Sequence, residues 1–233
     1  GFGGGGASFF PELIPRPGGG GGYSGGQGSY VYQDSAGAGG SYYNTMYVEN
    51  FIIGSKYSGS GKVIVKYKGG FIPRGKKTSL YAFDSFTFRT ETRGAIGPKL
   101  ETLKKLYKYT KWTQIPIFFS MDSKRQGIQI WTVPKTGYYK FDVSGAGGND
   151  NLGGYTSGAS STLTGYVKLK MNEKIHIACG QNGAIGGGDL MAGGHGGTFV
   201  VKEDGTPLII SGGGSGGINH QSGGTPRKKT DGI

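Results

Sequence analysis

Apolar and polar residues alternate through much of this chain. In residues 62–68, Val63, Val65 and Tyr67 are separated by polar or charged positions, and residues 83–90 alternate in the same way around phenylalanines. A period of two is typical of a half-buried β-strand. Further strands are expected at residues 51–53, 115–120, 127–133, 138–144, 163–170, 174–179, 198–202 and 208–211. Many short strands separated by turn residues predict a mainly β fold, a jelly-roll-like β-sandwich.

One segment follows a helical period instead. Pro98 suits the first turn of a helix over residues 99–111, and the segment's large apolar side chains fall largely on one face. Those side chains are Leu100, Leu103, Leu106, Tyr107 and Tyr109. A short helix between strands favours packing over a sheet, although a basic membrane-binding helix is the alternative. Residues 69–80 read as a polar connector, broken by Pro73 and Gly75.

Glycine interrupts this pattern in runs. The chain of 233 residues has 51 glycines. Glycine loses more backbone entropy on folding than any other residue, so ordered runs need a compensating interaction. Close packing of polyglycine II helices supplies one, because each backbone then bonds to its neighbours. The runs lack collagen's strict period of three. They lie at residues 3–6, 18–22, 37–40, 186–188, 193–197 and 212–217, with His195 and Ser215 inside the last two and Ala38 inside the third.

Composition narrows the possible partners. A net charge of +12 favours anionic partners such as glycans or acidic proteins, although a solvated basic face is the simpler interpretation. Nucleic acid is disfavoured because no Arg-Gly-Gly tract or RNA-recognition aromatic motif occurs. No apolar run is long enough to span a membrane. Because Cys179 is the single cysteine, no disulfide can form within the chain, and a buried thiol is expected. The start at Gly1 suggests a mature product or part of a longer chain.

Catalytic and cofactor motifs are missing. Residues 59–63 resemble the end of a phosphate-binding loop, but Val63 stands where a Mg²⁺-binding hydroxyl is needed. The three histidines have no metal-ligand spacing. Glu203 and Asp204 precede Gly205 in what reads as a hairpin turn. We therefore expect no enzyme activity, no cofactor and no metal.

Several strings resemble the extracellular glycine-rich region of the anaplastic lymphoma kinase and leukocyte tyrosine kinase receptors. The most specific is Gly-Ile-Gln-Ile-Trp-Thr-Val-Pro at residues 127–134. Other similar segments are residues 94–98, 108–110, 136–140, 144–148, 172–183, 193–201 and 207–214, and then residues 1–6, 18–26 and 59–65. Together they cover most of the chain.

The resemblance implies a jelly roll like that of tumour necrosis factor, with a bundle of polyglycine II helices inserted into it. It also implies a circular permutation, since residues 1–68 match the end of the family's region and residues 83–217 its beginning. The receptors' disulfides, growth-factor-like module, membrane span and kinase are not found here. On this basis the chain divides into residues 1–45 (bundle), 46–68 (strands), 69–82 (connector), 83–185 (strands and helix) and 186–233 (bundle with strands).

The expected glycine bundle suggests how copies of the chain could assemble. Glycine helices of one copy could complete the bundle of the next, a head-to-tail contact that builds a filament, or they could close within a monomer. The first predicts a secreted structural or adhesive protein whose main partner is itself; the alternative is a receptor-type or adhesin module that binds a protein or glycan. Trp131 is expected to pack under the sheet, and Tyr23 is expected to lie at the edge of the bundle. The residues assigned to structure and assembly are Gly3, Gly4, Gly5, Gly20, Gly21, Tyr23, Trp131, Gly193, Gly194, Gly196, Gly197, Gly212, Gly213 and Gly214.

Overall fold

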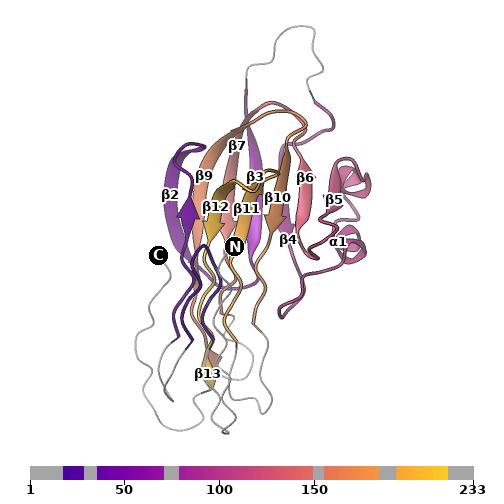
Figure 1. The fold of residues 1–233 in the computed structure, drawn as a ribbon. Helices are drawn as coiled ribbons and strands as arrows, with labels where there is room; N and C mark the ends of the chain where they lie inside the picture. Colours follow the sequence, from indigo (N-terminus) through magenta and orange to yellow (C-terminus); the bar gives the residue numbers. More distant parts are fainter. Residues whose placement is uncertain (1–17, 29–35, 71–78, 149–154, 184–192, 220–233) are drawn as a thin grey trace.

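Two antiparallel sheets face each other as a β-sandwich (Figure 1). The structure is a computed structural model that describes residues 18–28, 36–70, 79–148, 155–183 and 193–219. Its strands and single α-helix confirm the predicted mainly β, jelly-roll-like fold.

One sheet has six strands in the order β1-β12-β11-β10-β6-β5. These strands are β1 (Tyr42–Tyr43), β12 (Pro207–Ser211), β11 (Thr198–Lys202), β10 (Lys174–Ala178), β6 (Gln129–Thr132) and β5 (Phe119–Met121). The β11–β12 hairpin turns at Gly205, whose φ of 87° is in the left-handed region that favours glycine.

The second sheet has five strands in the order β2-β9-β7-β3-β4, and β8 pairs with β13 below it. The bounds are β2 (Val48–Tyr57), β9 (Ser160–Leu169), β7 (Gly137–Ser144), β3 (Lys62–Gly69), β4 (Ser85–Arg89), β8 (Tyr155–Thr156) and β13 (Ile218–Asn219). Val63 lies opposite Val143, and Val65 opposite Phe141. All four side chains are fully buried, so the predicted alternation on β3 does face the core.

The helix is shorter than the sequence pattern predicts. α1 (Leu100–Leu106) ends where Tyr107 turns its ring into the core, and the 3₁₀-helix η1 (Lys111–Gln114) follows. The Tyr107 hydroxyl donates to the carbonyl oxygen of Arg89 and accepts from the Arg89 amide, both at 2.8 Å. This anchor on β4 fixes the end of the helix, so the predicted continuation to residue 111 is wrong. The packed side of α1 contains Leu103, which is fully buried.

The strand predicted at residues 115–120 is also displaced. The amides of Phe118 and Phe119 both bond to the Ile115 carbonyl at 3.0 Å, which makes residues 115–118 a turn, and β5 begins only at Phe119. Pro116 inside this turn has no amide hydrogen for a sheet, which agrees with the turn.

Candidate assembly site

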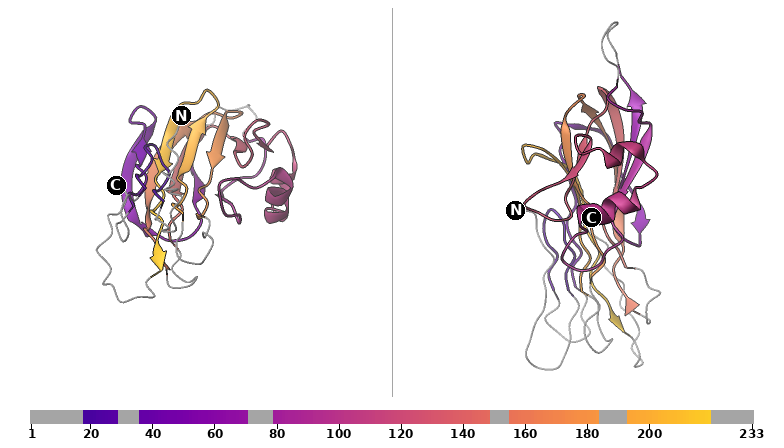
Figure 2. Two further views of the ribbon diagram at one scale, coloured as in Figure 1. Left: turned by 60° about the horizontal axis from the view of Figure 1, so that its bottom comes forward. Right: turned by 90° about the vertical axis from the view of Figure 1, so that its right-hand side faces the viewer.

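Glycine-rich segments leave the sandwich at one end and run side by side below it (Figures 1 and 2). We call these segments the glycine layer: residues 18–28, 36–41, 145–148, 157–159, 180–183, 193–197 and 212–217. Gly213 illustrates how they join. Its amide donates to the Gly21 carbonyl at 2.7 Å, and its own carbonyl accepts from the Gly39 amide at 2.8 Å. Segments far apart in the sequence therefore meet at one residue.

The segment around His195 has more neighbours than a strand in a flat sheet can have. The His195 carbonyl accepts from Gly21 at 2.8 Å, and its amide donates to Gly214 at 2.9 Å. The next residue, Gly196, accepts from Ala146 and donates to Gln181, each at 2.9 Å. Four segments thus bond to this one, whereas a β-strand bonds to two. The layer is a three-dimensional backbone lattice.

This lattice has no room for side chains at its contacts. A Cβ atom on Gly20 would meet the carbonyl oxygen of Gly213, and one on Gly39 would meet the oxygen of Gly21. Both contacts would be shorter than real Cβ atoms make. Glycine is therefore required here by the close approach of one backbone to another.

The structure places most of the predicted assembly residues together. Those found in the layer are Gly20, Gly21, Gly193, Gly194, Gly196, Gly197, Gly212, Gly213 and Gly214. Tyr23 lies at the margin, 48% exposed, with its ring stacked on Tyr42 at 4.3 Å between centroids. Trp131 lies apart from the layer, fully buried in the sandwich. Gly3, Gly4 and Gly5 are outside the described residues.

A groove of about 840 Å³ runs along the outer face of β10 and β11 and down to the glycine layer. Its floor includes Ala178 and Phe199, which lie opposite each other on β10 and β11. Its lower walls include Gly19, Gly194 and Gly197. Sequence reasoning missed the groove, because it forms between strands and a distant loop.

That loop, residues 93–98, is held firmly in place. The Gln181 side chain donates to the carbonyls of Gly94 at 2.9 Å and Ile96 at 3.0 Å. Gly97 packs directly on Gly127, where a Cβ on either residue would meet the other's Cα. The groove's wall is therefore built by specific contacts.

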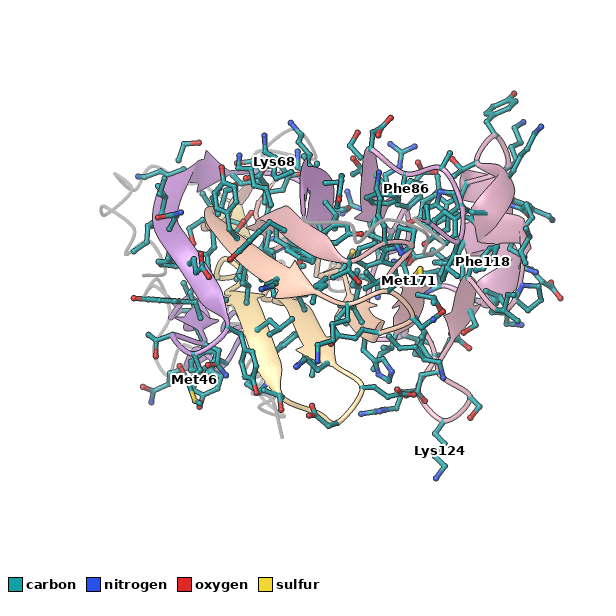
Figure 3. The ribbon with its side chains drawn as sticks, turned by 90° about the horizontal axis from the view of Figure 1, so that it is seen from above. Met46, Lys68, Phe86, Phe118, Lys124 and Met171 are labelled. Carbon is teal, nitrogen blue, oxygen red and sulfur yellow. The ribbon has the colours of Figure 1, made fainter. Side chains whose placement is uncertain are left out.

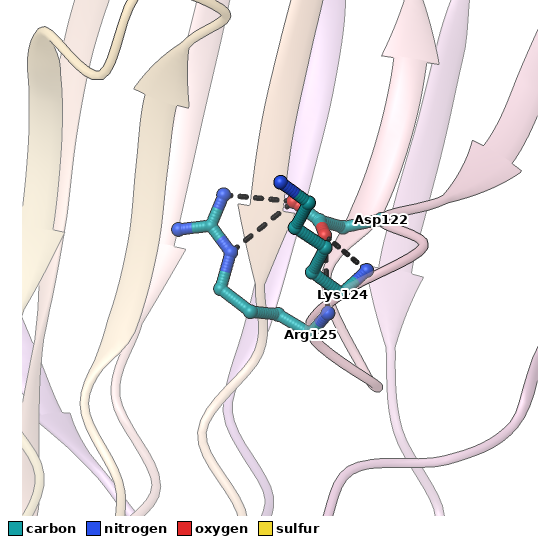
Figure 4. A network of polar contacts seen from close by, with 3 residues as sticks. All are labelled: Asp122, Lys124 and Arg125. Carbon is teal, nitrogen blue, oxygen red and sulfur yellow. Dashed lines mark hydrogen bonds and ion pairs between the residues drawn. The ribbon is translucent and has the colours of Figure 1, made fainter.

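Charged side chains gather at the other end of the groove. The Asp122 carboxylate accepts from the Arg125 guanidinium at 2.7 and 3.2 Å and from the amides of Lys124 and Arg125 (Figure 4). These hydrogen bonds, led by the Arg125 side chain, lower the pKa of Asp122. Lys124 itself extends away from the sheets (Figure 3). On the groove's floor, partial burial lowers the pKa of His176. At this end Arg125 is paired with Asp122, and Glu203 is paired with Lys174 at 3.1 Å.

Within the described ranges there is no group of His, Cys, Asp or Glu that could hold a metal ion. Burial raises the pKa of the Cys179 thiol to about 12, which suits a core residue and not a nucleophile. No helix in the described part of the chain is long and apolar enough to cross a membrane.

No family model, curated protein or solved structure matches the chain.

Proposed function

We propose that this protein is a non-enzymatic extracellular structural or adhesive protein whose copies join head to tail through glycine-rich segments. The supporting observation is the backbone lattice of the glycine layer, in which Gly21, Gly39 and Gly213 meet from segments far apart in the sequence. Such contacts use only amide and carbonyl groups. A glycine segment from another copy offers the same groups, so the lattice can extend between molecules.

We further propose that the layer's segments are polyglycine II helices, arranged as in the receptor family that the sequence resembles but circularly permuted. In its favour, the segment at His195 and Gly196 bonds to four neighbours, as parallel three-fold helices do and strands do not. Under the permutation, residues 1–68 and 83–217 are the two parts of one family domain. Consistent with this, β3 from the first part pairs with β7 and β4 from the second.

A head-to-tail contact joins two different surfaces, so it does not close after two copies and it builds a filament. We expect the purified chain to form filaments under negative stain, and sedimentation velocity to show species much larger than the 24.4 kDa monomer. Dilution should shift the distribution toward monomer. A single discrete particle at every concentration tested would contradict the proposal.

The groove favours a second candidate, a receptor-type or adhesin module that binds a protein or glycan. Its volume of about 840 Å³ is in the range of ligand-binding clefts. In that case the chain should run as a discrete monomer, and a panel of immobilised glycans and extracellular proteins should reveal a saturable ligand.

A further inference from the structure

We infer that the flank of the molecule formed by α1, η1 and the turn after η1 binds an anionic lipid surface. We call the exposed side of residues 104–117 the lysine-rich surface. It lies beside the sandwich and apart from the glycine layer, so the inference does not depend on head-to-tail assembly (Figure 1). It is drawn from two features that point to the same ligand: large apolar side chains in contact with water, and lysines without carboxylate partners.

The first feature is the apolar part of the lysine-rich surface. Tyr109 is 89% exposed, Ile117 71% and Ile115 41%. Pro116, between the two isoleucines, is exposed as well. Single exposed apolar residues are common on proteins, but a continuous apolar patch with a polar rim marks a contact with another protein or with a membrane.

These apolar side chains are held outward by the backbone that carries them. The Thr113 hydroxyl donates to the Thr110 carbonyl at 2.7 Å, and the Thr132 hydroxyl on β6 donates to the Ile117 carbonyl at 2.8 Å. Aromatic neighbours of the exposed residues fill the core and fix the same segment from below. These buried anchors are Tyr107, Trp112 and Phe119. The exposed side chains therefore belong to a rigid part of the fold.

The second feature is the positive charge around this apolar patch. Lys105, Lys108 and Lys111 are exposed, and Lys104 is half-buried. Among the residues that the structure describes, no carboxylate forms an ion pair with any of the four. Lys104 instead donates to the Gln114 carbonyl at 3.5 Å, and the Gln114 side chain donates back to the Lys104 carbonyl at 3.1 Å. This reciprocal contact joins the lysines of α1 to the residue that precedes the apolar turn.

An anionic bilayer satisfies both features at once. Isoleucine side chains enter the boundary between headgroups and acyl chains, and tyrosine suits the headgroup level. Lysines near the surface are attracted to anionic headgroups. An acidic polysaccharide would pair with the lysines but would leave Ile115 and Ile117 in water. A second copy of the same surface would place lysines against lysines, which is unfavourable.

The first test measures the contribution of charge. Binding of the full chain is followed by flotation with vesicles of phosphatidylcholine containing about 30% phosphatidylserine, at about 0.1 M NaCl. Changing the four lysines of this surface to Gln should lower the partition coefficient at least about tenfold. The matched control removes the same charge from exposed lysines on and beside the five-stranded sheet and should bind like the wild type. Its positions are Lys66, Lys68, Lys168 and Lys170.

The second test measures the contribution of the apolar turn. Ile115→Ser combined with Ile117→Ser keeps every charge and should also weaken vesicle binding about tenfold. Ile52→Ser combined with Ile53→Ser, at two largely exposed positions on β2, is the matched control and should have no effect. In a separate variant, Tyr109→Trp should give fluorescence that shifts to the blue with these vesicles and is quenched by lipids brominated on their acyl chains.

Three outcomes would overturn the inference. One is no binding of the wild-type chain to the anionic vesicles, and another is equal binding to vesicles of phosphatidylcholine alone. The third is full binding by the double serine variant, because the surface would then attract anionic polymers in general without entering lipid. Filament formation does not affect this test, since the variant with four glutamines can assemble and still lose vesicle binding.

Discussion

At the scale of single residues, aromatic hydroxyls satisfy the polar groups that the sandwich core encloses. Trp131 is fully buried, and its indole Nε1 donates to the Tyr81 hydroxyl at 2.7 Å. Tyr81 in turn donates to the Thr132 carbonyl. Tyr107 serves β4 in the same way, and its hydroxyl also lies 3.0 Å from the side-chain oxygen of Gln129. These tyrosines pair the Trp131 indole and the Arg89 backbone, groups that would each cost about 1–3 kcal/mol if they were left unsatisfied.

Alkaline pH should destabilise the protein through its buried tyrosines and its buried cysteine. Burial raises the pKa of Tyr81 and Tyr107 above the ordinary 10.0 and that of Cys179 from 9.0 to about 12. The unfolded chain therefore releases protons that the folded chain retains. Stability should be full below pH 9 and should fall by up to about 1.4 kcal/mol per pH unit per group as pH rises toward 12. Urea unfolding at pH 8 to 11 measures this slope, and Cys179→Ala should flatten it between pH 9 and 10. A pH-independent free energy of unfolding would contradict the prediction.

At the scale of elements, the sequence pattern predicted the presence of strands better than it predicted where helices and strands begin and end. The alternation around Val63 and Val65 predicts β3, because one face of that strand is buried against the second sheet. The end of α1 was not predictable, since it depends on the bond between Tyr107 and Arg89, which joins two segments 18 residues apart. β1 was missed because Tyr42–Tyr43 is too short for a period, and only pairing with β12 defines it.

At this scale, we predict that adding a side chain within the glycine layer destabilises the fold. Val at position 20 or 213 would place a Cβ against a backbone oxygen, of Gly213 in one case and of His195 in the other. Either substitution should destabilise the fold by about 1–3 kcal/mol or more, since backbone cannot rotate away as a side chain can. Thermal or urea unfolding measures the loss. Gln27→Val, at an exposed side chain of the same layer, is the matched control and should have little effect. Wild-type melting of Gly20→Val and Gly213→Val would rule out a close-packed lattice.

At the scale of the whole molecule, the fold places two kinds of surface apart. The glycine layer lies below the sandwich, while α1, which contains Lys104 and Lys105, lies beside β5 (Figure 1). The sequence suggested the layer, because ordered runs of glycine need an interaction that compensates for the backbone entropy they lose. It could not suggest the groove, whose wall depends on Gly97 meeting Gly127 and on Gln181 reaching Gly94 from another strand. Contacts of this kind have no signature in the spacing of residues.

The separation of these surfaces yields the last prediction, which concerns what holds copies together. Lys104, Lys105, Lys108 and Lys111 form a dense basic group on and after α1, and Lys105, Lys108 and Lys111 are exposed. Contacts between exposed charges fade as the Debye length falls from about 8 Å at physiological salt to about 3 Å at 1 M, whereas hydrogen bonds between uncharged backbones in a packed layer are little screened. Assemblies seen by sedimentation should therefore persist at roughly 1 M NaCl. The variant with all four lysines changed to Gln should assemble like the wild type. Dissolution by salt, together with loss of assembly in that variant, would move the interface to the lysine-rich surface and away from the glycine layer.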